Sequence, residues 1–480
     1  MKNRDNNILQ RLDWFTILLY LLLVTIGFFS ICGACYEFGS PTIIPPQSRP
    51  YSQLIWIALS TILIFIILMT EKSFFETTAY LMYGGVILLL IATIFLAKDI
   101  KGSHSWLVLG PIRLQPAEFA KFATALALAK FMSTYDFKLK NIKNFFISLA
   151  IIFVPMISII LQNETGSALV YFAFFFMLYR EGMTGYILGL GVSAVVYFVV
   201  GMKFADTLNV ITPVGELAVE GIILFLCFTM VYILRKDKKT ILIGLIFSAL
   251  SFGIGGLVSQ FIAVNFSLIS LGLISLMVIY FIILSLHKWV IQYALIAVFA
   301  IGSVAFLFSV HYVFNEILEP HQQTRILVSL GMKEDPNGAG YNVNQSKIAI
   351  GSGGILGKGF LNGTQTKLNY VPEQATDFIF CTVGEEQGFI GSSLVIILFS
   401  CFIIRLIILA ERQDRAFARI YGYCVASIFL FHLIINIGMV TGLTPVIGIP
   451  LPFFSYGGSS LWGFTLLLFI FIRLDASRKF

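Results

Sequence analysis

The chain has 480 residues, of which 58% are hydrophobic and 12% are charged, and its formal net charge is +7. Because soluble globular proteins carry about 25% charged residues, this composition excludes an ordinary soluble protein and indicates an integral membrane protein. We attribute the positive charge to cytoplasmic loops and exclude nucleic acid as a partner, because no basic cluster lies on a soluble module. The six cysteines provide neither a disulfide framework nor a set of metal ligands.

Long apolar runs occupy most of the chain, and a helix needs about twenty such residues to cross a bilayer. The pattern predicts an all-α polytopic membrane protein with about fourteen transmembrane helices. The predicted spans lie near residues 15–34, 53–70, 77–97, 116–133, 144–162, 166–180, 184–202, 217–234, 240–260, 263–286, 290–313, 386–409, 416–440 and 453–472. Lys2, Arg4 and Arg11 precede the first run, whose length is that of a retained span rather than a cleaved signal peptide.

The distribution of Lys and Arg predicts which loops face the cytoplasm. With a cytoplasmic N-terminus, the loops at 134–143, 235–240 and 411–419 and the tail from Arg473 all lie inside. Roughly twenty of the 32 Lys and Arg residues then face the cytoplasm, as the positive-inside rule requires. Both termini are therefore predicted inside, and the longest polar loop, residues 314–385, is predicted outside.

The loop at 314–385 contains most of the concentrated polar chemistry of the chain. It has eight glycines between Gly338 and Gly363, and glycine lets the backbone approach a ligand closely. Its cations are Arg325, Lys333, Lys347, Lys358 and Lys367. Glycine interleaved with Lys, Gln, Ser and Thr is typical of a cradle for an anion or a sugar phosphate. The alternative is a flexible, solvated loop with ordinary charges.

Asp377 lies in ATDFIF, close to the start of a predicted span. A carboxyl group at a membrane boundary with apolar neighbours is partly desolvated, which raises its pKa toward that of a useful general base. The alternative is structural, since Thr376 or Asp377 could cap the following helix. Position alone does not separate these two roles, and Glu373, Glu385 and Glu386 compete for the role of base.

A second polar segment is GSHSWLVLGPIRLQPAEFAKF at residues 102–122. Trp106 suits a position at the membrane interface or stacking on a sugar, and interface anchoring is the commoner role. Glu118 and Lys121 are three residues apart and share one helix face. Charged residues in a span usually face protein or water and mark function, although a purely structural ion pair remains an alternative.

The segment GLTPVIGIPLPFFSYGGSSLWG at 442–463 contains three prolines and cannot form a simple helix. It is predicted to be a rigid extracytoplasmic turn that supports structure rather than chemistry. The chain contains no serine-nucleophile elbow, P-loop, HExxH motif or dinucleotide-binding fingerprint. These absences argue against a hydrolase, an NTPase, a metalloprotease and a dehydrogenase.

Four blocks in order give the chain a resemblance to a known family. They are W-x-x-L-G-x-I-R-x-Q-P-x-E-x-A-K at 106–121, Q-x-x-R at 322–325 continuing to DPNGAGYNVNQSKIAIGSGG, P-E-x-x-T-D-F-I-F at 372–380, and PLPFFSYGGSS near the end. The chain resembles the SEDS family (shape, elongation, division and sporulation). The string QSKIAIGSGGILGKGFLNGTQT is more similar to the elongation members than to the division members.

The resemblance implies a bundle of ten spans, so about four spans are expected to be inserted in this chain. We therefore expect an N-terminal bundle at 1–202, inserted helices at 203–289, one span at 290–313, the extracytoplasmic catalytic loop at 314–385 and a C-terminal bundle at 386–480. Two positions depart from the family pattern. Ser105 replaces the usual Arg before the loop Trp, and Glu164 stands where the family has Asp.

The resemblance implies a peptidoglycan glycosyltransferase that polymerises lipid II into β-1,4 glycan strands during cell elongation. It assigns the family's essential acid to Asp377 and so favours the general base over the helix cap. With one base and inversion at the donor carbon, no covalent intermediate is needed. The substrate-binding residues expected from the matching blocks and the loop cations are Trp106, Arg113, Gln115, Glu118, Lys121, Gln322, Arg325, Gln345, Lys347, Lys358 and Glu373.

The resemblance further implies the partners and the location. The expected partners are lipid II, the glycan linked to undecaprenyl pyrophosphate, a class B penicillin-binding protein that acts as transpeptidase, and other membrane proteins of the elongation complex. The expected location is the bacterial cytoplasmic membrane with the active site facing the periplasm. The sequence shows no ligand set for a cofactor, although a divalent cation, Mg²⁺ or Mn²⁺, could assist. The rival functions are a lipid II flippase or another polytopic transporter, and a scaffold for a transpeptidase.

Overall fold

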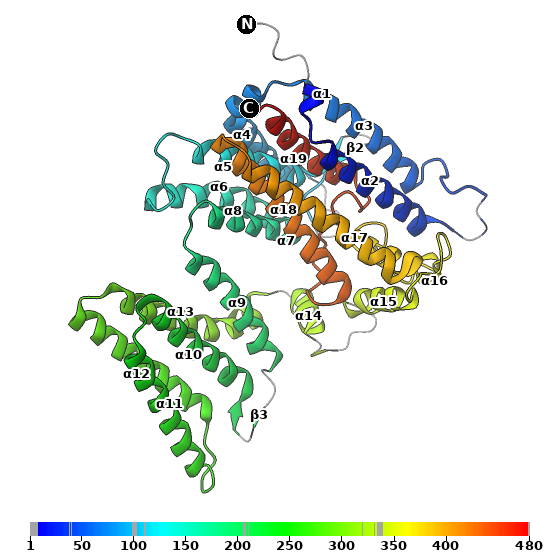
Figure 1. The fold of residues 1–480 in the computed structure, drawn as a ribbon. Coiled ribbons are helices and arrows are strands. Elements are labelled where there is room, and N and C mark those ends of the chain that lie inside the picture. The colour runs from blue at the N-terminus through cyan, green and yellow to red at the C-terminus, as the bar shows by residue number, and fades with distance from the viewer. Residues whose placement is uncertain are drawn as a thin grey trace. The chain divides into compact units, whose positions relative to one another are not determined.

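The computed structural model describes residues 8–37, 39, 41–97, 103–109, 112–204, 208, 209, 211–318, 320–330, 332, 333 and 339–478. The chain forms two compact units. Unit 1 consists of Met1–Thr184 and Pro336–Phe480, and unit 2 consists of Gly185–Asp335. Almost every element in both units is a helix (Figure 1).

Unit 1 combines the first and the last parts of the chain. Its helices are α1 (Ile8–Arg11), α2 (Trp14–Cys35), α3 (Arg49–Met69), α4 (Lys72–Leu96), α5 (Pro116–Met132), α6 (Ile142–Ile160), α7 (Thr165–Leu169), the 3₁₀ turn η1 (Val170–Ala173), α8 (Phe174–Arg180), α15 (Ala339–Ser352), α16 (Thr364–Lys367), α17 (Ile379–Glu411), α18 (Ala416–Thr441) and α19 (Gly458–Ala476). A short antiparallel hairpin of β1 (Leu107–Leu109) and β2 (Ile112–Leu114) precedes α5, with Val108 opposite Arg113.

Unit 2 is formed by the middle of the chain. Its helices are α9 (Gly185–Lys203), α10 (Val214–Arg235), α11 (Lys238–Val258), α12 (Phe266–Lys288), α13 (Ile291–Tyr312), the π-helical turn η2 (Val313–Ile317) and α14 (Pro320–Ser329), with a two-stranded antiparallel ladder of β3 (Leu208–Asn209) and β4 (Thr212–Pro213). A buried core that includes Val219, Ile274 and Ile296 joins α10, α12 and α13.

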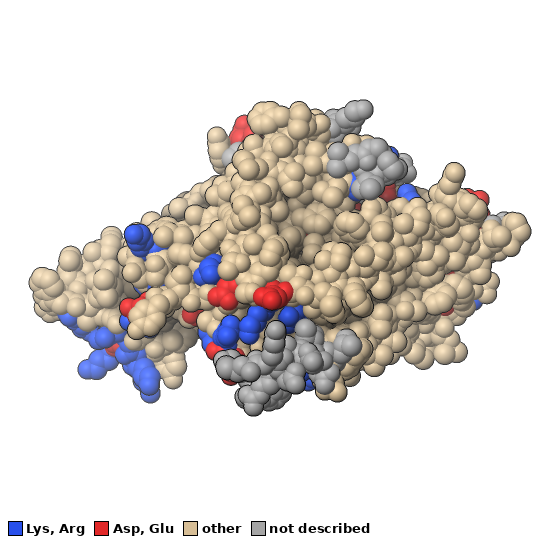
Figure 2. All heavy atoms as spheres, turned by 90° about the horizontal axis from the view of Figure 1, so that it is seen from above, with Lys and Arg blue, Asp and Glu red and all other residues tan. Residues whose placement is uncertain are grey.

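Within the described ranges, twelve helices are long and apolar enough to cross a bilayer. They are α2, α3, α4, α6, α9, α10, α11, α12, α13 with its extension to Glu316, α17, α18 and α19. The prediction of an all-α polytopic membrane protein is confirmed. On the face shown in Figure 2, large areas carry no Lys, Arg, Asp or Glu, and the charged residues gather in a few groups, as a lipid-facing surface requires.

The predicted number of fourteen spans is not confirmed, because two expected spans lack the length or the apolar character of the rest. The span predicted near 116–133 corresponds to α5, which has 17 residues and buries Glu118 and Lys121. The span predicted near 166–180 corresponds to Thr165–Arg180, where the 3₁₀ turn η1 joins α7 and α8. A helix surrounded by protein can carry charged residues that a lipid-facing helix cannot.

The centre of unit 1 is formed by α5, α18 and α19. In the 18-residue apolar stretches of α18 and α19, 67% and 83% of the residues are buried, respectively. α5 packs against both of these helices. A Cβ atom at Gly463 would lie 2.9 Å from the carbonyl oxygen of Glu118, so glycine allows α19 to approach α5 at this point.

Ion pairs join the start of α2 and the end of α19 to the end of α17. Asp13, before α2, accepts hydrogen bonds from Arg405 near the end of α17. Asp475, near the end of α19, accepts hydrogen bonds from Arg412. The N-terminus of α2 and the C-termini of α17 and α19 therefore lie together, and α15 and α16 lie at the opposite end of this unit.

The long loop predicted at 314–385 is mostly helical and contributes to both units. In unit 2, the side chain of Gln323 on α14 donates hydrogen bonds to the carbonyl oxygens of Phe314 (2.8 Å) and Leu318 (2.9 Å). In unit 1, α15 packs against α17 and α18. The boundaries expected for the inserted helices, 203–289, remain a prediction, and the structure groups a longer stretch, Gly185–Asp335, into unit 2.

Replacing Asp475 with Ala tests the ion pair that joins α17 to α19. The carboxylate is 1% exposed, and it accepts hydrogen bonds from Arg412 (3.0 Å to Nε) and from the amide of Gln413 (2.5 Å). Loss of these bonds leaves both donors without their acceptor, so we expect destabilisation of about 1–3 kcal/mol, measured as a lower thermal midpoint in detergent. Glu411→Gln is the control, because its bond to Arg180 is half exposed and exposed ion pairs contribute little. An equal loss in both variants would contradict this assignment.

Candidate active site

The turn that carries Asp377 is held by a segment far away in the sequence. The hydroxyl of Ser455 donates a hydrogen bond to the carbonyl oxygen of Thr376 (2.7 Å), and the backbone N–H of Tyr456 donates to Ala375 (2.8 Å). The segment 372–380 therefore lies beside the proline-rich segment between α18 and α19. These contacts bring together two motifs that are separate in the sequence, the block at 372–380 and the PLPFFSYGGSS block.

Asp377 is half-buried at the start of α17. The N-cap position of α17 belongs to Phe378, so neither Thr376 nor Asp377 is the cap residue. Gly448 has a left-handed backbone (φ +77°), and a Cβ atom there would lie 3.4 Å from Oδ2 of Asp377. The carboxylate therefore rests against a backbone that has no side chain at the point of contact.

Asn436 on α18 fixes the backbone on both sides of this contact. Its side-chain amide donates hydrogen bonds to the carbonyl oxygen of Asp377 (2.9 Å) and to that of Ile449 (2.7 Å). Asn436 is fully buried. One side chain thus sets the distance between the turn of Asp377 and the segment that contains Gly448.

A chain of polar side chains connects α5 to the same segment. The ammonium group of Lys121 lies 2.8 Å from Glu118 and 3.2 Å from Nε2 of His432. Because an ammonium group only donates, Nε2 of His432 accepts and Nδ1 carries the proton. Nδ1 then donates to the carbonyl oxygen of Pro450 at 3.0 Å. The pair of Glu118 and Lys121 that the sequence predicted is therefore present, and it is linked to the segment beside Asp377.

The two positions that depart from the family pattern contact each other. The hydroxyl of Ser105 donates to the Glu164 carboxylate (2.8 Å), which also accepts from the amide of Gln115 (2.7 Å) and the hydroxyl of Ser167 (2.8 Å). A Cβ atom at Gly166 would lie 2.6 Å from the carbonyl oxygen of Ile447. The turn of Glu164 therefore adjoins the segment that contains Gly448, and Gln115 lies within this group.

Other expected site residues of unit 1 differ in their exposure. Trp106 is half-buried before β1, and Arg113 is exposed on β2. Lys347 is exposed on α15, and its ammonium group lies 2.5 Å from the position of a Cβ atom at Gly442, the C-cap of α18. Gln345, on the same helix, is half-buried.

Glu373 belongs to the turn of Asp377. It has a left-handed backbone (φ +51°), and its carboxylate accepts a hydrogen bond from the Thr376 hydroxyl (3.3 Å). Gln322 and Arg325 lie on α14 in unit 2. The side chains of these two residues lie outside the described part of the structure, so their expected role remains a prediction.

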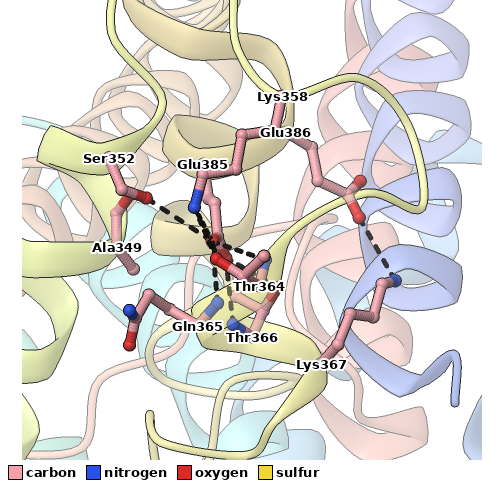
Figure 3. A network of polar contacts seen from close by, with 9 residues as sticks. All are labelled: Ala349, Ser352, Lys358, Thr364, Gln365, Thr366, Lys367, Glu385 and Glu386. Atoms are coloured by element: carbon pink, nitrogen blue, oxygen red, sulfur yellow. Dashed lines mark hydrogen bonds and ion pairs between the residues drawn. The ribbon is translucent and has the colours of Figure 1, made fainter. Parts of the chain in front are cut away.

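Glu385 organises the glycine-rich loop (Figure 3). Its carboxylate is fully buried and accepts hydrogen bonds from the backbone N–H groups of Thr364 (2.7 Å), Gln365 (2.8 Å) and Thr366 (2.9 Å). The ammonium group of Lys358 lies 2.7 Å from the same carboxylate. The charge of Lys358 is therefore already balanced by Glu385, one of the carboxylates that compete with Asp377 for the role of base.

A break in α17 locks the preceding loop to the helix. Gly388 has non-helical dihedral angles (φ +65°, ψ −159°). Around this break, the N–H groups of Lys358 and Gly359 donate to the carbonyl oxygens of Glu385 (3.0 Å) and Glu386 (2.9 Å), and the N–H of Phe389 donates to Gly354 (2.9 Å). The loop thus satisfies backbone groups that the interrupted helix leaves open.

Lys367 attaches the same loop to α2. Its ammonium group is buried, pairs with Glu386 at 3.3 Å, donates a hydrogen bond to the carbonyl oxygen of Gly33, and lies 5.0 Å above the ring of Tyr36. Burial lowers the pKa of Lys367, and the charge of Glu386 opposes this effect. Lys367 is therefore a structural cation, and with these bonds the loop from Gly354 to Lys367 is tightly held rather than flexible.

The described residues contain no group of three or more His, Cys, Asp and Glu side chains that could hold a metal ion. Asp377 and Glu373 are two carboxylates of one turn, and a magnesium ion bound by substrate phosphates needs only one or two carboxylates. The divalent cation considered from the sequence therefore remains a prediction.

Replacing Glu385 with Gln tests the role of this carboxylate in ordering the loop. The variant weakens the bonds to three backbone N–H groups and to Lys358, so we expect faster amide hydrogen exchange across 354–367, by about tenfold or more. Lys358→Ala should have a smaller effect, because the three backbone bonds persist. Mass spectrometry of exchanged peptides measures both. An equal or larger effect of Lys358→Ala would contradict the assignment.

Three comparisons place the chain among known proteins. The family model described as cell cycle protein, for FtsW, RodA and SpoVE, matches residues 13–212 and 218–480. The chain is 29% identical to the peptidoglycan glycosyltransferase RodA of Treponema pallidum (strain Nichols) over 467 residues, which cover 97% of this chain and 98% of that protein. It is 27% identical to the peptidoglycan glycosyltransferase MrdB of Escherichia coli (strain K12) over 406 residues, which cover 84% of this chain and 80% of that protein.

Two solved structures have the same fold. One is a chain from work described as structural coordination of polymerization and crosslinking by a peptidoglycan synthase complex, with a TM-score of 0.58, 23% identity and coverage of 97% of this chain and 98% of that one. The other is the rod shape determining protein RodA of Thermus thermophilus, with a TM-score of 0.55, 19% identity and 98% coverage of both chains. The resemblance that the sequence motifs indicated is confirmed by these matches. The chain is therefore a multi-pass membrane protein that belongs to the FtsW, RodA and SpoVE family of cell cycle proteins.

Proposed function

We propose that the protein is a peptidoglycan glycosyltransferase that polymerises lipid II into β-1,4 glycan strands during cell elongation. The names of the relatives from Treponema pallidum and Escherichia coli support this activity. The observation that carries the proposal is the position of Asp377. This half-buried carboxylate rests against Gly448 and lies in a turn fixed by Asn436 and Ser455.

Asp377 acts as the general base in a single displacement. It takes the proton from the 4-hydroxyl of the acceptor N-acetylglucosamine, and that oxygen attacks the anomeric carbon of the donor chain. The bond between this carbon and the diphosphate breaks, and undecaprenyl pyrophosphate leaves with the bonding electrons. An α-linked donor becomes a β-linked product, so one inversion and one base suffice. A positioned base contributes about 10²–10⁴ in rate.

Cations stabilise the charge that develops on the leaving diphosphate. Lys121 and Lys358 suit this role less than expected, because both are already paired with an acid. Lys121 lies 2.8 Å from Glu118, and Lys358 lies 2.7 Å from Glu385. Lys347 and Arg113 are exposed and are better candidates. Lys347 lies beside Gly442, which is six residues beyond Asn436 on α18. Six residues correspond to about 9 Å along a helix, and Asn436 bonds to the backbone of Asp377. Arg325 and a divalent cation, Mg²⁺ or Mn²⁺, complete the proposed set.

The active site faces the periplasm of a bacterial cytoplasmic membrane, and both termini lie in the cytoplasm. The positions of the basic residues support this orientation. Arg405, Arg412 and Arg473 lie at the end of unit 1 where α2 begins and α17 and α19 end, and α15 and α16 lie at the opposite end. A class B penicillin-binding protein and other membrane proteins of the elongation complex are the proposed partners, and the description of one structurally similar complex, which couples polymerization to crosslinking, supports the first.

Asp377→Asn should lower the rate of lipid II polymerisation at least 100-fold, because the amide cannot accept the proton. The measurement uses pure protein in detergent, with and without the transpeptidase partner, and gel analysis of labelled glycan. Asp136→Asn is the control, because this carboxylate is 73% exposed in the loop after α5. Polymerisation by Asp377→Asn near the wild-type rate would refute the assignment of the base. Detergent also distinguishes a polymerase from a flippase, whose activity needs a sealed bilayer.

Cysteine labelling tests the proposed orientation. In a background without the six native cysteines, Tyr135→Cys and Leu443→Cys place thiols at exposed positions in the loops after α5 and α18. In intact spheroplasts, a membrane-impermeant maleimide should label Leu443→Cys, and it should label Tyr135→Cys only after the membrane is opened. The reverse pattern would place Asp377 on the cytoplasmic side.

A further inference from the structure

Unit 2 contains a buried acidic site that the proposed reaction does not use. Glu216 and Glu220 are one turn apart on α10, and both face the first turns of α12. Glu220 is completely buried and Glu216 is half-buried. An ionised carboxylate inside a membrane protein is costly unless it is paired. The surroundings of these two side chains therefore decide what they can bind.

The hydrogen bonds around the two carboxylates are incomplete. The Ser267 hydroxyl lies 3.0 Å from Oε1 of Glu220 and 3.3 Å from Oε2 of Glu216, but it has one proton and can donate to only one of them. Oε2 of Glu220 is buried with no hydrogen-bond partner. The hydroxyl of Ser270 faces the same carboxyl group and is also buried without a completed hydrogen bond.

The two carboxylates and the two serine hydroxyls together have more oxygen atoms that can accept a hydrogen bond than protons that can be donated. Along the described part of the chain, no Lys or Arg forms an ion pair with Glu216 or Glu220. A side chain of another protein cannot reach Glu220, because this residue has no exposed surface. A small cation between the two carboxylates, or a proton on one of them, would balance these oxygens.

The elements that carry these oxygens are fixed before any ion binds. Thr212, in β4, accepts a hydrogen bond from the N–H of Phe266 (3.0 Å) and donates to the carbonyl oxygen of Val264 (3.3 Å). Asn265 caps α12 by accepting from the N–H of Ser267 (3.0 Å). A metal site requires ligands on rigid elements, and both helices meet this condition.

We propose that Glu216, Glu220, Ser267 and Ser270 form a binding site for a divalent metal cation between α10 and α12. Two carboxylates balance the charge of a divalent ion, and ligand sets made only of oxygen suit Mg²⁺, Ca²⁺ and Mn²⁺. The ion supplies the missing partner of Oε2 of Glu220 and of the Ser270 hydroxyl. The site does not depend on the proposed glycosyltransferase activity and shares no residue with it.

The test is the thermal unfolding of the full chain in detergent after removal of metal with a chelator. Titration with CaCl₂, MgCl₂ or MnCl₂ should raise the unfolding midpoint in the wild type, with a shift that grows with the logarithm of the cation concentration. NaCl at matched ionic strength should not. Glu220→Gln should abolish the shift, and Ser270→Ala should weaken the apparent affinity about tenfold or more.

Glu37→Gln is the matched control, because it removes an exposed carboxylate of the same type and should leave the shift unchanged. Ser270→Ala keeps both carboxylates, so it remains informative if Glu220→Gln does not fold. A shift that persists unchanged in Glu220→Gln or in Ser270→Ala would overturn the proposal. So would a wild-type protein whose midpoint responds to none of the divalent cations, since the carboxyl group would then hold a proton.

Discussion

The geometry around Asp377 depends on hydrogen bonds from one face of α18 to backbone carbonyl oxygens. His432 and Asn436 are four residues apart and thus share a face, and they donate to Pro450, to Ile449 and to Asp377 itself. A proline-rich segment cannot hold itself in place with a regular pattern of backbone bonds. The two buried side chains supply the missing donors, and they fix the backbone of the turn that carries Asp377 relative to the segment with Gly448.

Three of the cations expected at the site form ion pairs within the protein instead. Lys121, Lys358 and Lys367 are each paired with an acid, namely Glu118, Glu385 and Glu386. Counting cations in the sequence therefore overestimates the positive charge that a diphosphate would meet. Lys347 and Arg113 are exposed. Lys121 and Lys367 are buried and Lys358 is partly buried, and an ammonium group that loses contact with solvent requires a counter-charge.

The sequence predicted the class of fold, the pair of Glu118 and Lys121, and the partly buried position of Asp377. Those features leave local signals, namely apolar runs, a spacing of three residues and a carboxylate among apolar neighbours. His432, Asn436 and the role of Glu385 were missed, because their partners lie 18, 59 and about 20 residues away along the chain. The number of fourteen spans is not confirmed, because hydropathy alone does not show that α5 is short and largely surrounded by protein. Ser105 and Glu164 are the two departures from the family pattern, and their hydrogen bond explains how they coexist. No local pattern in the sequence reveals this contact.

The break at Gly388 has a consequence for biogenesis. Backbone groups on both sides of this break bond to residues 354–359, a stretch that precedes α17 in the chain and so leaves the ribosome earlier. If α17 entered the bilayer alone, these groups would face hydrocarbon without partners. Residues 354–359 must therefore be available to bond with α17 when this helix enters the bilayer, which makes the order of synthesis part of how the helix becomes stable in the membrane.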